Sequence, residues 1–136
     1  MGLLARLLRR TAVPPVSYDL ADPSLVVLVE AFEAARADSS VLAEAAARGV
    51  DLAQPLLVRH HLVDLPAASL ERAAALLGQD GYAVVAGGPG LVHACRTQVL
   101  TALSASQERS RMAGLAQRLG GDVAGWDALR PAAPPA

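Results

Sequence analysis

The sequence predicts an α+β protein in which a ferredoxin-like split βαβ sandwich follows an N-terminal helical extension. Three observations support this fold class: strands and helices alternate from residue 56 onward, glycines and prolines separate them, and the chain is short. With 136 residues, of which 53% are hydrophobic, the chain can form one core. The predicted helices cover one face of an antiparallel sheet, which leaves the other face for solvent or a partner.

The predicted domain begins with a strand over residues 56–63, which are rich in branched side chains and bounded by Pro55 and Pro66. Leucine and alanine at helical spacing then predict a helix over residues 66–78. Turn glycines and short apolar runs predict a hairpin made of strands 81–86 and 91–100, with its turn at 87–90.

A last helix is predicted from a capping-box pattern, Ser104 with Gln107, and from apolar residues that repeat along one face up to Gly120. Residues 122–129 are consistent with a short fourth strand or with an irregular cover. The proline-containing end, residues 130–136, has the composition of a disordered tail.

Two helices are expected before the domain. The pair Asp22-Pro23 is a helix-start signal, and apolar residues at helical spacing extend it over residues 23–36. A second helix is expected over residues 39–48. The predicted organisation is therefore a flexible basic N-terminus, a helical extension, a domain and a tail, over residues 1–22, 23–55, 56–129 and 130–136.

The charge of the chain is nearly balanced, with a formal net charge of −1, so we expect no direct nucleic-acid partner. The distribution is uneven, because residues 1–10 carry three arginines and residues 19–51 carry seven acids. The sequence leaves open whether residues 1–10 contact a membrane or a partner. No apolar run reaches the length of a membrane span. The single cysteine, Cys95, indicates a reducing compartment, and we expect a cytoplasmic protein.

No set of residues with catalytic spacing is present, so the sequence predicts a protein that is not an enzyme and needs no metal or cofactor. Neighbouring His60 and His61 point to opposite faces of a strand, although one of them could lie near His93. The run Gly87-Gly-Pro-Gly90 lacks the lysine and hydroxyl residue of a phosphate-binding loop. Cys95 is expected to be a buried hydrophobic residue.

The candidate residues for binding a partner lie on the predicted sheet face and at the end of the domain. On the sheet, strand alternation displays Arg59 with His61, or Arg96 with Gln98. At the end of the domain, Trp126 is either an indole that closes over the core or an aromatic anchor for a partner. Asp122 precedes it in the same glycine-rich segment.

The same segment resembles a known family. Residues 109–126 read Arg-Ser-Arg-Met-Ala-Gly-Leu-Ala-Gln-Arg-Leu-Gly-Gly-Asp-Val-Ala-Gly-Trp, and this run resembles the end of the regulator of ribonuclease E activity B family (RraB-like proteins). Upstream, residues 50–62 and 76–85 look like the first strand of that family and its passage from helix to second strand. Val123 and Ala124 differ from the family pattern, which has tyrosine and aspartate there.

The resemblance implies a ferredoxin-like domain that binds a ribonuclease E-type endoribonuclease and inhibits it. With Val123 and Ala124 in place, the sequence does not decide whether that inhibition is retained. The alternative is a small-molecule-sensing or dimerising ferredoxin-like module, which would form a dimer in solution. In both hypotheses the protein binds and does not catalyse.

Overall fold

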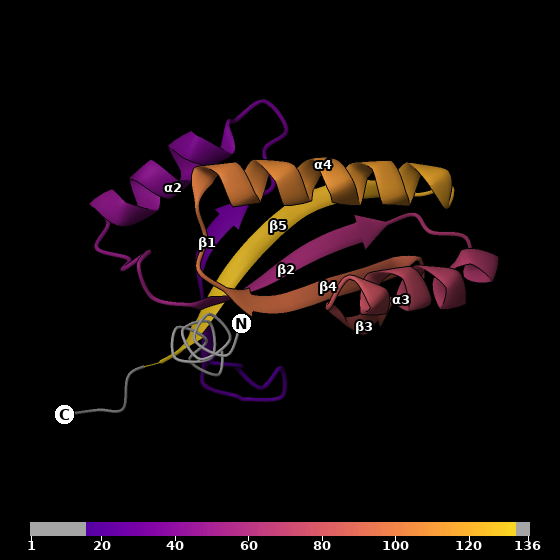
Figure 1. Cartoon of the computed structure of the whole chain (residues 1–136), viewed down its shortest axis with the longest axis horizontal. Coiled ribbons are helices and arrows are strands. Elements are labelled where there is room, and N and C mark those ends of the chain that lie inside the picture. The colour runs from indigo at the N-terminus through magenta and orange to yellow at the C-terminus, as the bar shows by residue number, and fades with distance from the viewer. Residues whose placement is uncertain (1–15, 133–136) are drawn as a thin grey trace, which may run out of the picture.

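The computed structural model describes residues 16–132, which form one five-stranded antiparallel sheet with helices packed against it. The strand order is β1-β5-β2-β4-β3. Figure 1 shows the elements, which in chain order are β1 (Leu25–Ala31), α2 (Asp38–Ala47), β2 (Leu56–Val63), the short 3₁₀ helix η1 (Ala67–Ser69), α3 (Leu70–Gln79), β3 (Ala83–Gly88), β4 (Leu91–Gln98), α4 (Ala102–Arg118) and β5 (Asp122–Pro131).

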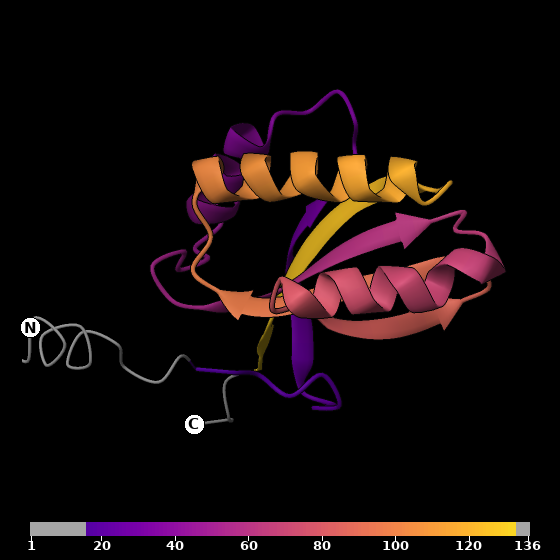
Figure 2. The same ribbon diagram turned by 45° about the vertical axis from the view of Figure 1, so that its right-hand side comes forward.

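The α helices all lie on one face of the sheet, and α4 and α3 run side by side across it (Figures 1 and 2). The core between helices and sheet has two parts. In one, α2 and the start of α4 pack over β1, β2 and β5 around Trp126. In the other, α3 and the rest of α4 pack over β2 and β4 around Met112 and Leu77. This arrangement confirms the predicted α+β class with helices on one face.

The opposite face, which we call the open face, is partly covered by residues 16–24. A small apolar cluster of Leu57, Cys95 and Leu129 lies there, and Tyr18 packs over it. The backbone N–H of Tyr18 donates to Thr97 Oγ1 at 3.0 Å, and its hydroxyl donates to the carbonyl of Pro55 at 3.2 Å. One half of the open face is therefore covered, and the half around His61 is not.

The helix predicted over residues 23–36 is wrong, because these residues form strand β1, which pairs with β5 at the edge of the sheet. The start signal has another use here: Asp22 Oδ1 accepts hydrogen bonds from the N–H and hydroxyl of Ser24, both at 2.8 Å, in a turn. Closely spaced valines then favour a strand, since β-branched side chains lose rotamer freedom in a helix. The expected N-terminal helical extension is thus corrected to a strand followed by one helix, α2.

Other boundaries differ less. The cap of α4 is Thr101, three residues before the expected Ser104, because Thr101 and Ser104 form the capping box and Gln107 takes no part. The last segment is a ten-residue strand, β5, that pairs with both β1 and β2 and includes Pro131. Of the N-terminus expected to be flexible, residues 1–22, and the expected tail, residues 130–136, the parts 1–15 and 133–136 lie outside the described residues. In the described parts, Tyr18 packs on the sheet, and Arg130 and Pro131 belong to β5. The division of the chain at residue 55 stays a prediction.

Gly125 allows β1 and β5 to approach closely. Its φ angle is +141°, which L side chains rarely adopt. A Cβ atom at this position would clash with the carbonyl oxygen of Ala31 and lie 3.0 Å from the Cα of Phe32. Gly125 therefore allows the end of β1, at Ala31 and Phe32, to pack directly against β5.

Candidate partner-binding site

A polar cluster lies on the uncovered half of the open face, where β2 and β5 run side by side. Arg59 binds the carboxylate of Asp127 with two hydrogen bonds, Nε to Oδ1 at 2.9 Å and Nη2 to Oδ2 at 2.5 Å. His61 Nε2 lies 3.0 Å from the same Oδ1. Asp127 is 4% exposed, whereas the Arg59 side chain is 26% exposed. The predicted residues Arg59 and His61 therefore share a face, and a buried carboxylate holds both.

Two further rings, those of His93 and Phe32, extend this cluster. The rings of His61 and His93, which are cross-strand partners on β2 and β4, lie 4.3 Å apart between centroids. Phe32, just beyond β1, meets the His61 ring edge to face at 4.9 Å. Phe32 is 41% exposed, so it presents an apolar surface beside the polar groups. We refer to Phe32, Arg59, His61, His93 and Asp127 as the open-face cluster.

The ionisation of the open-face cluster follows from its contacts. Burial opposes ionisation of Asp127, but hydrogen bonds from His61 and Arg59 outweigh it and lower the pKa of the carboxyl. The hydrogen bonds to Asp127 raise the pKa of Arg59. Burial, and then the nearby charges of His61 and Arg59, lower the pKa of His93. At neutral pH the cluster therefore combines an Arg–Asp ion pair with a neutral His93.

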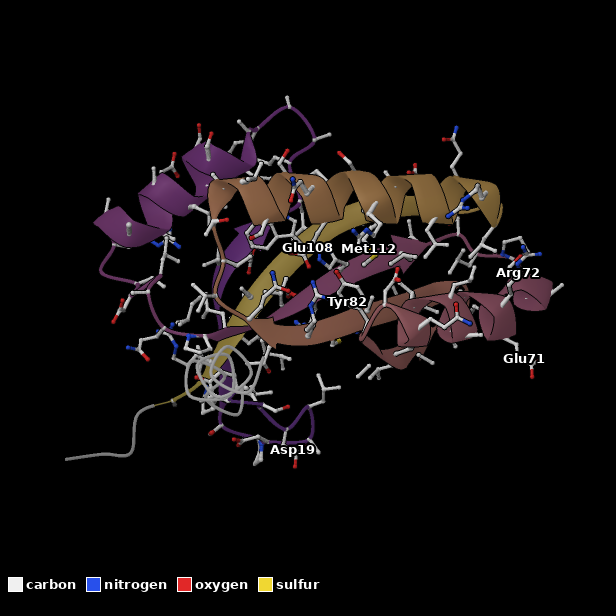
Figure 3. The ribbon with its side chains drawn as sticks, viewed as in Figure 1. Asp19, Glu71, Arg72, Tyr82, Glu108 and Met112 are labelled. Carbon is white, nitrogen blue, oxygen red and sulfur yellow. The ribbon has the colours of Figure 1, made fainter. Side chains whose placement is uncertain are left out.

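Arg96 and Gln98, the alternative pair, lie on the other face, beneath α4. Glu108 of α4 receives hydrogen bonds from Arg96 Nη2 at 2.6 Å, from Gln98 Nε2 at 2.6 Å and from the hydroxyl of Tyr82 at 2.7 Å. The guanidinium of Arg96 also lies 4.2 Å above the Tyr82 ring. Figure 3 shows Tyr82 and Glu108 meeting between the sheet and α4. These contacts tie the helix to the sheet, so Arg96 and Gln98 are used within the fold.

Glu108 is ionised in this buried position. Burial alone would raise the pKa of its carboxyl, but His60, Tyr82 and Gln98 stabilise the anion, and the pKa falls to about 2. His60 is 1% exposed, its Nε2 is 3.9 Å from Glu108 Oε1, and neither ring nitrogen has a hydrogen-bond partner among the described residues. Burial, together with Glu108, raises the pKa of Tyr82.

The two remaining candidates lie at opposite extremes of exposure. Trp126 is 1% exposed, and its indole N–H donates to Asp38 Oδ1 at 3.2 Å. Arg109 donates to the same carboxylate, with its shortest contact at 2.6 Å. The indole thus closes over the core, and a partner could reach it only if its surroundings moved. Asp122 is exposed, and its Oδ1 accepts from the N–H of Val123 at 2.7 Å.

Cys95 is buried, and burial raises the pKa of its thiol to about 11, so its reactive thiolate is scarce at neutral pH. Among residues 16–132, no three histidine, cysteine or acidic side chains are grouped so that they could hold a metal ion. None of the helices in this range is long and apolar enough to cross a membrane.

Sequence reasoning missed Phe32, Asp127 and Glu108. Phe32 was missed because residues 23–36 were wrongly predicted to form a helix. Glu108 was missed because an acidic residue in a helix usually faces solvent. Asp127 had one usable signal, because in a strand that buries Trp126 and Ala128 on one face, the residue between them must lie on the other.

The fold and the site define a binding protein, with helices on one face of a sheet and a partly exposed cluster of rings and paired charges on the other. A family model described as "RraB: Regulator of ribonuclease activity B" matches residues 35–128. The chain belongs to this family, as the resemblance of its last helix and strand predicted. No curated protein and no solved structure matches the chain.

Membership of this family gives the chain its functional class, a non-catalytic regulator of ribonuclease E activity. The match spans α2 and nearly all of the sheet from β2 to β5, whereas β1 lies before it. The matched region therefore contains the polar residues of the open-face cluster, while Phe32 comes from the preceding segment.

Proposed function

We propose that the chain binds a ribonuclease E-type endoribonuclease directly and slows its cleavage of RNA. The observation that carries this proposal is the family match over residues 35–128. The chemistry of the site supports it, since Asp127 holds both Arg59 and His61 in place on the open face. The proposed compartment is the cytoplasm, which agrees with a single, buried, free cysteine.

We infer that β2 to β5, with α3 and α4, form the ferredoxin-like unit of this fold. Among these four strands the first and third are neighbours at the centre, and the second and fourth flank them, all antiparallel. A helix follows the first strand and another follows the third, which is the split βαβ order. Strand β1 would then be an addition at the edge beside β5.

The uncovered half of the open face is the proposed contact surface. It combines an exposed aromatic ring with partly exposed polar groups, the composition that protein interfaces favour. The Arg59–Asp127 pair is already neutralised, so a partner can cover it without leaving a lone charge buried. Phe32 supplies the apolar centre of this surface.

The test is a binding and cleavage assay with the purified chain and the ribonuclease E-type enzyme from the same cell. We expect a complex at micromolar concentration or below and slower RNA cleavage when the chain is in excess. The change Phe32→Ala should weaken binding about tenfold or more, as loss of an aromatic anchor does. The control is Leu103→Ala on α4, a side chain that is more exposed than Phe32 (67% against 41%), and it should leave binding unchanged. Absence of a complex at micromolar concentration would overturn the proposal.

A further inference from the structure

A groove runs along the outer edge of the sheet, between β1 and α2. It has a volume of about 480 Å³, and its walls include Val27, Glu30, Phe32, Glu33, Val41 and Arg48. The groove is continuous with the open-face cluster, because Phe32 lines the groove and also packs on His61. A partner seated on the open face could therefore extend a segment into it.

One wall of the groove is a free strand edge. Strand β1 pairs with β5 on one side and with no described strand on the other. Such an edge carries backbone groups that can pair with an added strand. At the Leu28 end the edge is occupied, because Arg48 Nη2 donates to the carbonyl of Leu28 at 2.9 Å. A register shift between Val27 and Val29 also interrupts the strand there.

At the Phe32 end the groove is acidic. Glu30 and Glu33 are exposed, and neither has an ion-pair partner among residues 16–132. The nearby Arg36 does not neutralise them, since it is paired with Glu44. Arg48 is engaged at the opposite end of the groove. Two carboxylates without ion-pair partners among residues 16–132 thus flank an exposed aromatic ring, and they favour binding of a basic group.

The groove also has an apolar part, which favours an occupant that carries apolar side chains. Val27 and Phe32, which both line the groove, are 37% and 41% exposed and present an apolar surface there. We propose that the groove takes an extended segment of a partner protein in which apolar and basic residues alternate. The segment adds a strand to β1 at the Phe32 end of the groove, places apolar side chains against Phe32, and places basic side chains beside Glu30 and Glu33.

The identity of that partner as a ribonuclease rests on the proposed function, whereas the chemistry of the groove can be tested alone. The probe is a fluorescein-labelled ten-residue peptide of alternating arginine and valine, titrated with the full chain and followed by fluorescence anisotropy. We expect saturable binding that weakens as salt is added. The same peptide with glutamate in place of arginine should not bind.

Two matched double variants separate the groove from general acidity. Glu30→Gln with Glu33→Gln should weaken peptide binding about tenfold, the effect of losing two exposed ion pairs. Asp19→Asn with Glu71→Gln removes the same charge from exposed sites that Figure 3 shows away from the groove, and it should leave affinity unchanged. Unchanged Trp126 fluorescence and circular dichroism establish that both variants are folded. Equal weakening by both variants would overturn the proposal.

Added-strand pairing is tested with the peptide N-methylated at alternate residues, which removes the backbone donors that face β1. We expect at least tenfold weaker binding from this peptide. Unchanged affinity would show that no strand is added and would overturn the proposal. If the peptide does not bind but ribonuclease inhibition persists, the proposed role of the groove is overturned and the proposed function is retained. Peptide binding without any ribonuclease complex would support the groove as a binding site and overturn the proposed function.

The same titration distinguishes two alternative occupants of the groove, the chain's own N-terminal residues and a second copy of the chain. The chain itself carries Arg6, Arg9 and Arg10, so a full-length variant with all three changed to glutamate is titrated in parallel. A tenfold gain in peptide affinity in that variant would assign the groove to the chain's own N-terminal residues. A dimer in sedimentation that Glu30→Gln with Glu33→Gln dissociates would assign it to a second copy. Either result would overturn the assignment to a partner segment.

Discussion

Asp127 is the residue on which the polar side chains of the open face converge. It accepts two hydrogen bonds from Arg59 and one from His61 while it is 4% exposed. A buried carboxylate of this kind is stable only while its partners remain, because an unpaired charge in the interior is costly. The arrangement therefore makes the positions of Arg59 and His61 depend on one side chain.

The change Asp127→Asn tests this dependence. It keeps the shape of the side chain but leaves Arg59 without its anion, and we expect a loss of about 2 kcal/mol in the free energy of unfolding. Urea denaturation at pH 7 measures the loss. The control is Asp122→Asn on the same strand, whose exposed side chain should contribute less than about 0.5 kcal/mol. Equal effects of the two changes would contradict the assigned role of Asp127.

Glu108 makes the free energy of unfolding depend on pH in the acid range. Its pKa in the folded chain is about 2, below the usual value of 4.5, so the ionised carboxylate stabilises the fold above pH 4.5. That contribution is lost as the pH falls from 4.5 toward 2, and we expect it to amount to about 2 kcal/mol. Urea denaturation at pH 7 and pH 3 should show more than half of this loss in the unchanged chain, because pH 3 lies within the titration range. The Glu108→Gln variant should show a smaller loss, and an identical loss would refute the prediction.

At the level of elements, the start of α4 depends on a local hydrogen-bond exchange. Thr101 Oγ1 accepts from the N–H of Ser104, and Ser104 Oγ accepts from the N–H of Thr101, both at 3.0 Å. This satisfies two donors that the first turn of a helix otherwise leaves unpaired. The helix carries Ala105 in one part of the core and Met112 in the other, so its start positions both parts.

The change Thr101→Ala should lower the free energy of unfolding by about 1 kcal/mol, because it removes the side-chain acceptor of the cap. Thermal unfolding followed by circular dichroism measures this effect. Ser110→Ala, at an exposed position in the middle of the same helix, is the control and should be neutral within about 0.5 kcal/mol. A cap variant as stable as the control would show that α4 is held by packing alone.

The elements that sequence reasoning predicted well are those in which local and tertiary preferences agree. The strand over residues 56–63 has branched side chains and is central in the sheet, and the final helix has a regular apolar stripe. Strand β1 could not be predicted because its helical spacing of apolar residues was read as an amphipathic helix. Its strand form depends on β5, which lies about 100 residues later in the chain.

The site was predictable only in part, for a related reason. Strand alternation correctly put His60 and His61 on opposite faces. The sequence left open which of the two lies near His93, and the structure shows that it is His61. It could not reveal that Glu108, from a helix, would take up Arg96 and Gln98, since no periodicity specifies a contact between a helix and a sheet. The pairing of Arg59 with Asp127 likewise required the register of β2 on β5.

On the scale of the whole molecule, Trp126 connects segments that are distant in sequence. Its indole N–H binds Asp38 at the start of α2, and Arg109 of α4 binds the same carboxylate and the carbonyl of Ala31 at the end of β1. Strand β1, α2, α4 and β5 therefore meet around one buried ring. These contacts are between elements on both sides of the predicted boundary at residue 55.

We expect residues 16–132 to unfold as one cooperative unit for this reason. Because Trp126 is the only tryptophan, its fluorescence reports that junction, while far-ultraviolet circular dichroism reports all helices and strands. The two signals should give the same midpoint in urea. A fluorescence midpoint clearly below the circular-dichroism midpoint would show that the segment before residue 55 is released first.

The contact between Gly125 and the end of β1 has a consequence for the diversity of the family. A methyl group at this one position cannot be accommodated while Ala31 and Phe32 stay where they are. Family members with a larger residue at the equivalent site should therefore have a displaced first strand or none at all, and with it no aromatic ring over the histidine pair. The residue found there offers a way to sort relatives by the shape of this surface before any of their structures is determined.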